Sequence, residues 1–131
     1  MFSLLQLSKD ITIKKKLLLV LPRNERGFWG KVTREKTGFV RLSLPTLAAL
    51  TPADWVVEIH DSRVSPVDYN RHVDLVGITA FTAEIPSAYA IADEFRKRSV
   101  KVVMGGVHVS ALPDEALTHA DAVVIGEAEY V

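Results

Sequence analysis

The sequence predicts an α/β fold of the Rossmann-like, flavodoxin type, and three observations lead to it. Apolar runs typical of buried parallel strands alternate along the chain with helical segments. Several of these runs stop at a Gly or Thr, and small residues at strand ends leave a broad groove for a ligand. Because crossovers between parallel strands are right-handed, we expect a doubly wound sheet of five strands in the order 2-1-3-4-5, with helices on both faces.

Five segments have the composition of strands. They are, in chain order, residues 16–21, 56–61, 75–79, 102–104 and 122–125. The first is apolar without interruption up to Pro22, which is typical of a strand that is buried on both faces. The second alternates apolar and polar residues from Val56 to Asp61, so we expect it in a more exposed position of the sheet.

Three segments between these strands are predicted to be helices. They are residues 43–50, 84–97 and 113–119. The first and the last carry Pro45 and Pro113 in their first turns, where a missing N–H does no harm. The middle segment is the clearest, because its apolar residues recur at helical spacing, and we expect Thr82 to cap it.

The chain of 131 residues is long enough for one domain with a core and too short for two. We expect a lead-in segment over residues 1–15 and one domain over residues 16–131. Residues 23–41 are predicted to be a long loop of the kind that carries function. Because the chain stops directly after its last predicted strand, we expect no closing helix, a further domain downstream, and some self-association of this fragment.

The composition excludes several classes of function. A formal net charge of zero provides no basic field for nucleic acid. The absence of Cys excludes disulfides, zinc–thiolate sites and iron–sulfur clusters within this chain. No apolar run approaches the roughly 20 residues of a membrane span, and the lysines follow the apolar start, unlike in a secretory signal. We therefore expect a cytoplasmic protein.

Known nucleotide and metal motifs are also missing. The first strand is followed by neither a G-x-G-x-x-G sequence nor a P-loop, and no cluster of acids marks a phospho-acceptor site. The four histidines lack metal-ligand spacing, so we predict no metal site and no catalytic residue. His108, after Gly105 and Gly106, leaves two interpretations open. Its ring contacts the ligand directly, or it bonds a loop carbonyl and orients the loop.

Three motifs follow one another in the second half of the chain. They are L-V-G-I-T at 75–79, G-G-V-H-V-S at 105–110 with P-D-E-A-L at 113–117, and V-V-I-G-E-A-E at 123–129. In this order they resemble the N-terminal cobalamin-binding domain of B12-dependent radical SAM enzymes. That group includes the anaerobic magnesium-protoporphyrin IX monomethyl ester cyclases and many methyltransferases. The resemblance covers residues 16–131.

The resemblance implies where the cofactor binds. The nucleotide tail of cobalamin would run beside the third, fourth and fifth strands, where Thr79 and Thr82 would offer hydroxyls to it. The corrin ring would lie above the strand ends. The cofactor-binding residues predicted in this way are Pro22, Arg23, Thr79, Ala80, Phe81, Thr82, Gly105, Gly106, Val107, His108, Gly126 and Glu127.

Gly106 offers a test of this assignment. If Gly106 is small because the tail passes against it, a bulky side chain there blocks binding and leaves the fold largely intact. If the turn needs a positive φ, even Ala destabilises the domain.

The resemblance also implies a coordination state and a division of labour. Related domains that ligate cobalt through a histidine carry D-x-H-x-x-G after the first strand, and residues 22–30 contain nothing of that form. Cobalamin would then bind base-off without a protein histidine. The [4Fe-4S] cluster and S-adenosylmethionine would belong to a downstream radical SAM domain. The predicted function is a cobalamin-binding module, inactive alone, of a methyltransferase or cyclase. The alternative is a flavodoxin-like nucleotide-binding or partner-docking domain without corrinoid.

Overall fold

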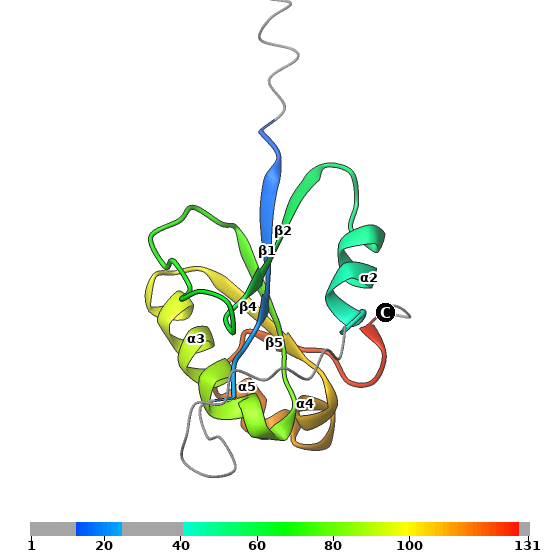
Figure 1. The fold of residues 1–131 in the computed structure, drawn as a ribbon, viewed down its shortest axis with the longest axis vertical. Coiled ribbons are helices and arrows are strands. Elements are labelled where there is room, and N and C mark those ends of the chain that lie inside the picture. Colours follow the sequence, from blue (N-terminus) through cyan, green and yellow to red (C-terminus); the bar gives the residue numbers. More distant parts are fainter. Residues whose placement is uncertain (1–12, 25–40, 129–131) are drawn as a thin grey trace, which may run out of the picture.

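The computed structural model describes residues 13–24 and 41–128. Within these ranges a five-stranded sheet has the order β2-β1-β3-β4-β5, and all neighbouring strands are parallel (Figure 1). The strands are β1 (Lys15–Leu21), β2 (Trp55–Asp61), β3 (Leu75–Thr79), β4 (Lys101–Gly105) and β5 (Ala122–Val123). The fold class and the strand order predicted from the sequence are confirmed.

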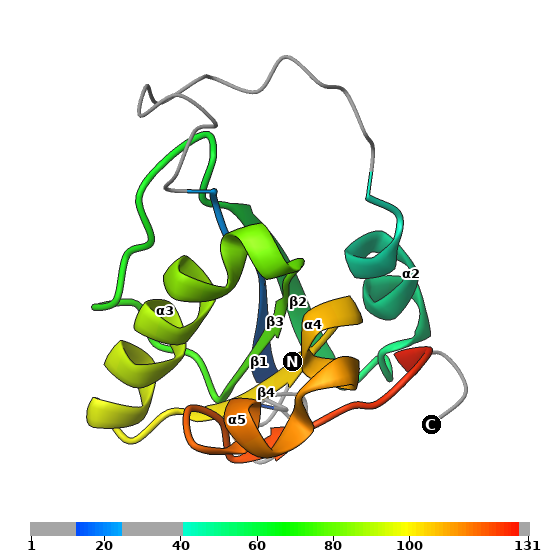
Figure 2. The ribbon, with the colours of Figure 1, turned by 90° about the horizontal axis from the view of Figure 1, so that it is seen from below.

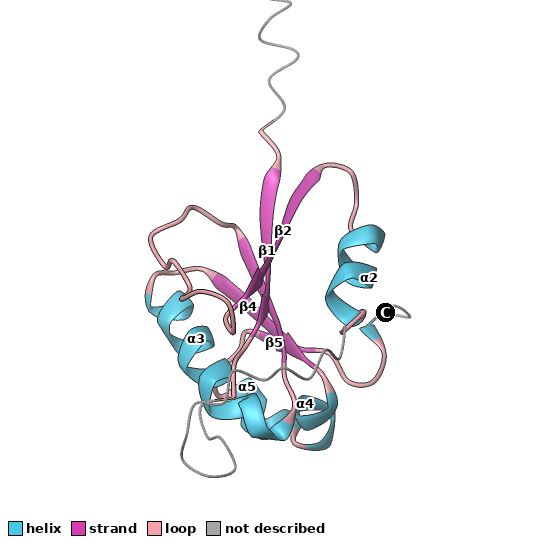
Figure 3. Ribbon diagram, viewed as in Figure 1, coloured by secondary structure: helices cyan, strands magenta, loops and turns pink. Residues whose placement is uncertain are grey.

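Helices cover both faces of this sheet, as Figures 2 and 3 show. Helix α2 (Ser43–Leu50) lies on one face, and α3 (Ile85–Lys97) lies on the other. The α3 face also carries the short helices α4 (Val107–Ala111) and α5 (Pro113–Leu117). A single 3-10 turn, η1 (Thr82–Glu84), leads from β3 into α3.

The main hydrophobic core lies between the sheet and α3. Alternate residues of β1, β3 and β4, such as Leu18, Val76 and Val102, point into it, since successive side chains of a strand face opposite sides. Helix α3 contributes Ala88 and Phe95, which share one side of the helix and are fully buried. These contacts bury β1, β3 and β4 on this face.

The opposite face of the sheet has a much smaller core. Leu19 and Leu21 of β1 pack there against Leu44 of α2. Helix α2 contacts β1 and β2, and the neighbouring β3 presents Gly77 on this face, which offers no side chain to pack. The surface of β3 and β4 beside α2 therefore remains uncovered by any helix of the described residues.

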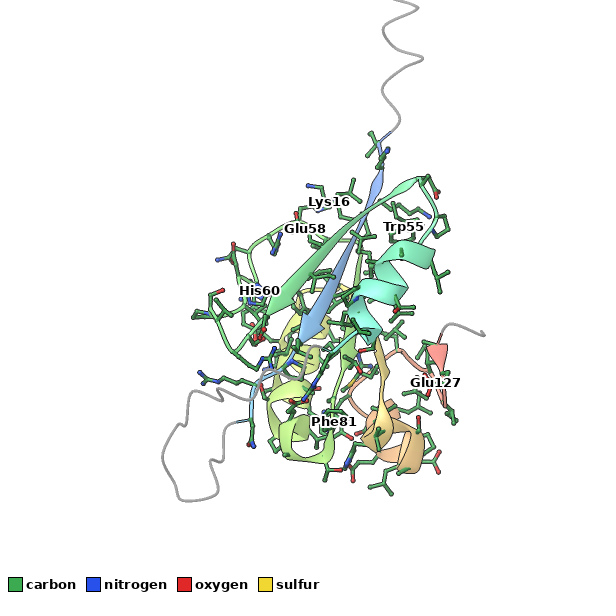
Figure 4. The ribbon with its side chains drawn as sticks, turned by 45° about the vertical axis from the view of Figure 1, so that its right-hand side comes forward. Lys16, Trp55, Glu58, His60, Phe81 and Glu127 are labelled. Carbon is green, nitrogen blue, oxygen red and sulfur yellow. The ribbon has the colours of Figure 1, made fainter. Side chains whose placement is uncertain are left out.

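The edge strand β2 contains no buried residue, in line with the exposed position that its alternating sequence predicts. Trp55 lies on the side of α2, whereas Glu58 and His60 lie on the other side (Figure 4). Glu58 forms an ion pair with Arg71 from the connection between β2 and β3.

The structure differs from the sequence-based expectation after β4. Residues Val107–Ala111 form a helix, α4, which the sequence pattern does not predict, because five residues are too few for a helical period to register. The last helix ends at Leu117 rather than His119, where the Thr118 hydroxyl donates to the carbonyl of Glu115 at 2.7 Å. Strand β5 ends at Val123 rather than Ile125, since pairing with β4 stops there.

The predicted cap of α3 is also wrong. The Thr82 hydroxyl makes no capping bond to this helix and lies 3.2 Å from Nδ1 of His108. The backbone N–H of Phe81 donates to Oε2 of Glu84 at 3.1 Å, and this bond spans the 3-10 turn η1 that precedes α3.

Parts of the chain lie outside the described ranges. These parts are residues 1–12, 25–40 and 129–131. The first range holds most of the predicted lead-in, and the second holds most of the predicted long loop. In the ranges that are described, no helix is long and apolar enough to cross a membrane.

Candidate functional site

A groove with a volume of about 980 Å³ lies on the α2 face of the sheet. Its floor is formed by β3 and β4 through Gly77, Thr79 and Gly105. Helix α2 forms one wall, and the segment 124–128 after β5 contributes the opposite wall. The groove opens at the carboxyl ends of the strands, the usual ligand-binding edge of a doubly wound sheet.

Small residues create the floor, and two glycines do so for different reasons. A Cβ added at Gly77 would come within 2.8 Å of Cδ2 of Leu19, so Gly77 accommodates a neighbouring core side chain. A Cβ added at Gly105 would meet only Val124, at an ordinary 3.7 Å. Among the described residues, packing thus leaves room for a Cβ at Gly105, and the lack of a side chain at this position leaves space in the groove.

Gly106 is small because of the fold. Its φ is +103°, and an added Cβ would lie 2.8 Å from the carbonyl oxygen of Ala80 and 2.9 Å from Oγ1 of Thr79. Thr79 is the last residue of β3, and Ala80 follows it directly. A side chain at Gly106 would therefore force the ends of β3 and β4 apart. The expectation that a bulky residue at Gly106 leaves the fold intact is therefore wrong.

A partly buried ion pair lies at the mouth of the groove. Nη1 of Arg41 donates to Oε2 of Glu84 at 2.7 Å, and Nη2 of Arg41 bonds the second carboxylate oxygen. Glu84 is 3% exposed, and the guanidinium of Arg41 also lies 4.1 Å from the ring centroid of Phe81. The pair joins the start of α2 to the start of α3, and its opposite charges compensate each other.

Phe81 presents a half-exposed ring at this edge of the groove. Glu127 lies in the segment 124–128, near α2 (Figure 4). On the far side, the Gly126 N–H donates to Oγ of Ser110 at 3.0 Å, which ties the segment after β5 to α4. The surroundings of the groove therefore combine apolar side chains with a few hydroxyl and charged groups.

His108 points away from the groove into the α3 side of the molecule. Its ring is buried, with Nδ1 3.2 Å from Oγ1 of Thr82 and Nε2 3.1 Å from Oε1 of Glu115. The ring thus bonds side chains of η1 and α5, and the predicted bond to a loop carbonyl is not what the structure contains. The bond from His108 and a second bond from the hydroxyl of Tyr89 lower the pKa of Glu115.

Tyr89 of α3 completes this cluster. Its hydroxyl donates to Oε1 of Glu115 at 2.8 Å, and its ring meets that of His108 edge-on. Burial and then the bond to Glu115 raise the pKa of Tyr89.

The comparison with known protein families decides what kind of domain this is. The family model described as the B12 binding domain matches residues 41–131. The chain belongs to the B12-binding domain family. The predicted resemblance to cobalamin-binding domains is thereby confirmed.

Three relatives of this B12-binding domain are methyltransferases by name. The bacteriochlorophyllide d C-8(2)-methyltransferase of Chlorobaculum tepidum is 46% identical over 89 residues, covering 67% of this chain and 20% of that protein. The bacteriochlorophyllide d C-12(1)-methyltransferase of the same organism is 33% identical over 135 residues, covering 98% of this chain and 28% of that protein. The uncharacterized methyltransferase PH0819 of Pyrococcus horikoshii is 35% identical over 127 residues, covering 87% and 27%.

The chain thus spans between 20% and 28% of the length of these relatives. No solved structure gives a significant match to it.

Most of the residues predicted to bind the cofactor line the groove of this B12-binding domain. They are Thr79, Ala80, Phe81, Gly105, Gly106, Val107, Gly126 and Glu127. The other predicted residues, Pro22, Arg23, Thr82 and His108, are not among the residues that line it. Pro22 is fully buried at the end of β1, and Arg23 is exposed.

Sequence reasoning missed the α2 wall of the groove. The residues concerned are Arg41, Leu42, Ser43, Leu44, Thr46 and Leu47. No local pattern shows which residues of a short helix face a groove. Gly77 carried an unused signal, because a glycine inside a strand often marks a close approach of other atoms.

The groove has the chemistry that an elongated, partly polar ligand needs. The floor at Gly105 can be approached closely, the wall residues Leu44 and Leu47 are apolar, and Thr79 and Ser110 supply hydroxyls. Among the residues with described positions, no group of three or more His, Cys, Asp or Glu could hold a metal ion.

Proposed function

We propose that this chain is the cobalamin-binding module of a B12-dependent radical SAM methyltransferase. The nucleotide tail of cobalamin would lie in the groove between α2 and the segment 124–128. One observation carries the proposal. This chain of the B12-binding family has an open groove, and the glycine on its floor, Gly105, has room for a Cβ that the packing of the described residues does not exclude.

The proposed roles of the residues follow from their positions. Thr79 and Ser110 would donate or accept hydrogen bonds along the tail, and Leu44 and Leu47 would pack against its apolar parts. Phe81, at the mouth, would contact the edge of the corrin ring. Bound cobalamin would supply the methyl-carrying chemistry, and this chain would hold and orient it.

The methyltransferase assignment is supported by the names of the relatives, and it is preferred here over a cyclase. The [4Fe-4S] cluster and S-adenosylmethionine would then belong to a downstream domain of the full-length protein. We expect the chain alone to leave S-adenosylmethionine unchanged. Turnover of S-adenosylmethionine by the isolated chain after cluster reconstitution would contradict this division of labour.

We also propose that cobalamin binds base-off, without a histidine on cobalt. No histidine occurs between Pro22 and Arg41, and none of the four histidines lines the groove. His108 and His119 bond carboxylates on the opposite face of the sheet. Electron paramagnetic resonance of the Co(II) form should show no nitrogen superhyperfine splitting from an axial ligand.

A titration with hydroxocobalamin, followed by absorption spectroscopy, tests the groove. Gly105→Leu should reduce the affinity strongly, because its side chain would occupy the floor, while the melting temperature changes little. Ala90→Leu adds an equally large side chain at an exposed position of α3 and serves as the matched control.

The outcomes separate two kinds of failure. Absence of binding by the wild-type chain would contradict cobalamin binding and favour a flavodoxin-like domain without corrinoid. Unchanged affinity in a folded Gly105→Leu protein would contradict the assignment of the cobalamin site to this groove.

The uncovered floor of the groove also leads us to expect weak self-association of the chain, which light scattering over a range of concentrations measures.

A further inference from the structure

Helix α4 connects the ends of three neighbouring strands of the sheet. At its N-terminal end, Gly106 packs against the backbone that follows β3. His108 lies within 3.2 Å of the Thr82 hydroxyl in η1, and Ser110 accepts the N–H of Gly126 after β5. The connections that follow β3, β4 and β5 therefore all depend on where this one helix lies.

The helix is too short to hold this position by itself. An isolated helix below about 12 residues is marginal in water, and α4 has 5 residues. Its place is thus decided by its tertiary contacts. Val109 supplies the apolar contact, being fully buried in the main core, and His108 supplies the polar one.

His108 bonds two other elements at once. Its Nδ1 pairs with Thr82 of η1, and its Nε2 pairs with Glu115 of α5, which Tyr89 of α3 holds by a bond of 2.8 Å. We call these residues, Thr82, Tyr89, His108 and Glu115, the His108 cluster. A buried ring whose two nitrogens are both engaged has one favoured orientation, so the cluster fixes the rotation of α4.

We propose that His108 is a positioning residue for the groove: through the His108 cluster it holds α4, and with it the Gly105–Gly106 backbone and Ser110, without touching the ligand. The proposal rests on the proposed function. His108 would thus affect cobalamin affinity although its ring lies on the α3 face of the sheet and the groove lies on the α2 face.

The test compares single variants of the isolated chain in hydroxocobalamin titrations and thermal melts. His108→Ala, Thr82→Val and Glu115→Gln should each lower the affinity of the folded protein, with a loss of about 10-fold for His108→Ala. The matched control is His60→Ala. His60 lies on the edge strand β2, far from β4 in the strand order, and its Nε2 lies 3.0 Å from the carbonyl oxygen of Ser65. Its loss should leave the affinity unchanged.

Isosteric substitutions sharpen the test. His108→Asn can keep a polar group near the position of Nδ1 and reach Thr82, whereas His108→Gln can keep one near Nε2 and reach Glu115. Each should restore part of the affinity that His108→Ala loses. In the double variant His108→Ala/Thr82→Val, the loss should be no greater than in His108→Ala alone, because both changes break the same bond.

The outcomes distinguish the inference from the function on which it rests. A wild-type chain that does not bind hydroxocobalamin contradicts the proposed function itself. Unchanged affinity in a folded His108→Ala protein, or an equal loss in the His60→Ala control, overturns the positioning role only. If His108→Ala does not fold, Thr82→Val and Glu115→Gln decide, since both retain the ring. One pattern would overturn the proposal. If Thr82→Val and Glu115→Gln bind hydroxocobalamin as tightly as the wild type, while folded His108→Gln binds it more weakly, His108 contacts the ligand directly.

Discussion

The two faces of the sheet use their residues differently. On the α3 face, the strands present Leu18, Val76 and Val102, and each is fully buried under helices. On the α2 face, β3 and β4 present Gly77 and Gly105, and a groove takes the place of a packed layer. A face that is filled to interior density stabilises the fold, while a face of small residues leaves room for a ligand. Stability and binding are thus separated by the sheet.

The largest expected effect tests the α3 face. Phe95→Ala removes the largest fully buried side chain of the described residues and should lower the free energy of unfolding by about 4 kcal/mol. Leu44→Ala, on the α2 face, should lower it by about 2–3 kcal/mol and also reduce cobalamin affinity, since Leu44 lines the groove. Urea unfolding and titration measure both. A greater loss of stability from Leu44→Ala would contradict the comparison.

The second prediction concerns the ion pair that joins the two faces at the mouth of the groove. Glu84→Gln leaves the charge of Arg41 without its carboxylate partner and should lower the free energy of unfolding by about 3 kcal/mol. Glu94→Gln removes an exposed pair with Arg98 and is the control, with an expected change below about 0.5 kcal/mol. Equal melting temperatures for the two variants would show that the Arg41–Glu84 pair contributes no more to stability than the exposed pair does.

The third prediction separates two adjacent glycines. Gly106→Ala should lower the free energy of unfolding by about 1 kcal/mol or more, because of its positive φ and the contact with Ala80. Gly105→Ala should change stability by less than about 0.5 kcal/mol and weaken cobalamin binding. Thermal melts beside titrations test this, and the reverse order of stability would refute the explanation given for each glycine.

The smallest expected effect is a dependence on pH at the edge of the sheet. The backbone N–H of Val102 donates to the carboxylate of Asp121 and, with Lys101, lowers its pKa below the usual 3.8. The unfolded chain therefore binds the proton more readily, so this stabilisation is present above pH 3.8 and is lost as the pH falls through the lowered pKa.

Asp121→Asn should cost less than about 1 kcal/mol at pH 7, because the group is exposed to solvent. The variant should also lose less stability on acidification than the wild type. Urea unfolding at pH 7 and pH 3 measures the difference, and identical pH dependence in both proteins would contradict the role of Asp121.

The sequence predicted what depends on local pattern. The continuous apolar run that ends before Pro22 and the helical spacing from Ile85 to Phe95 indicated the parallel sheet and its main helix. The sequence did not predict where β5 ends, because hydrogen bonds to the neighbouring strand decide where pairing stops.

Part of the candidate site could also be predicted. Thr79 and Gly105 end their strands, and Gly126 follows β5 closely. The carboxyl ends of parallel strands meet at one edge of the sheet, and all three residues line the groove. The α2 wall was missed, because which residues of a short helix face a groove depends on how the helix packs against the sheet.

By itself, the sequence determined the fold class, the strand order and the edge of the sheet where small residues gather, because these follow from hydrophobic periodicity and chain connectivity. Only the tertiary structure decided the contacts between residues far apart in the chain. It paired Arg41 with Glu84, which are 43 positions apart, and turned His108 from the groove towards Glu115. Such contacts depend on the relative placement of packed elements, which no local pattern encodes.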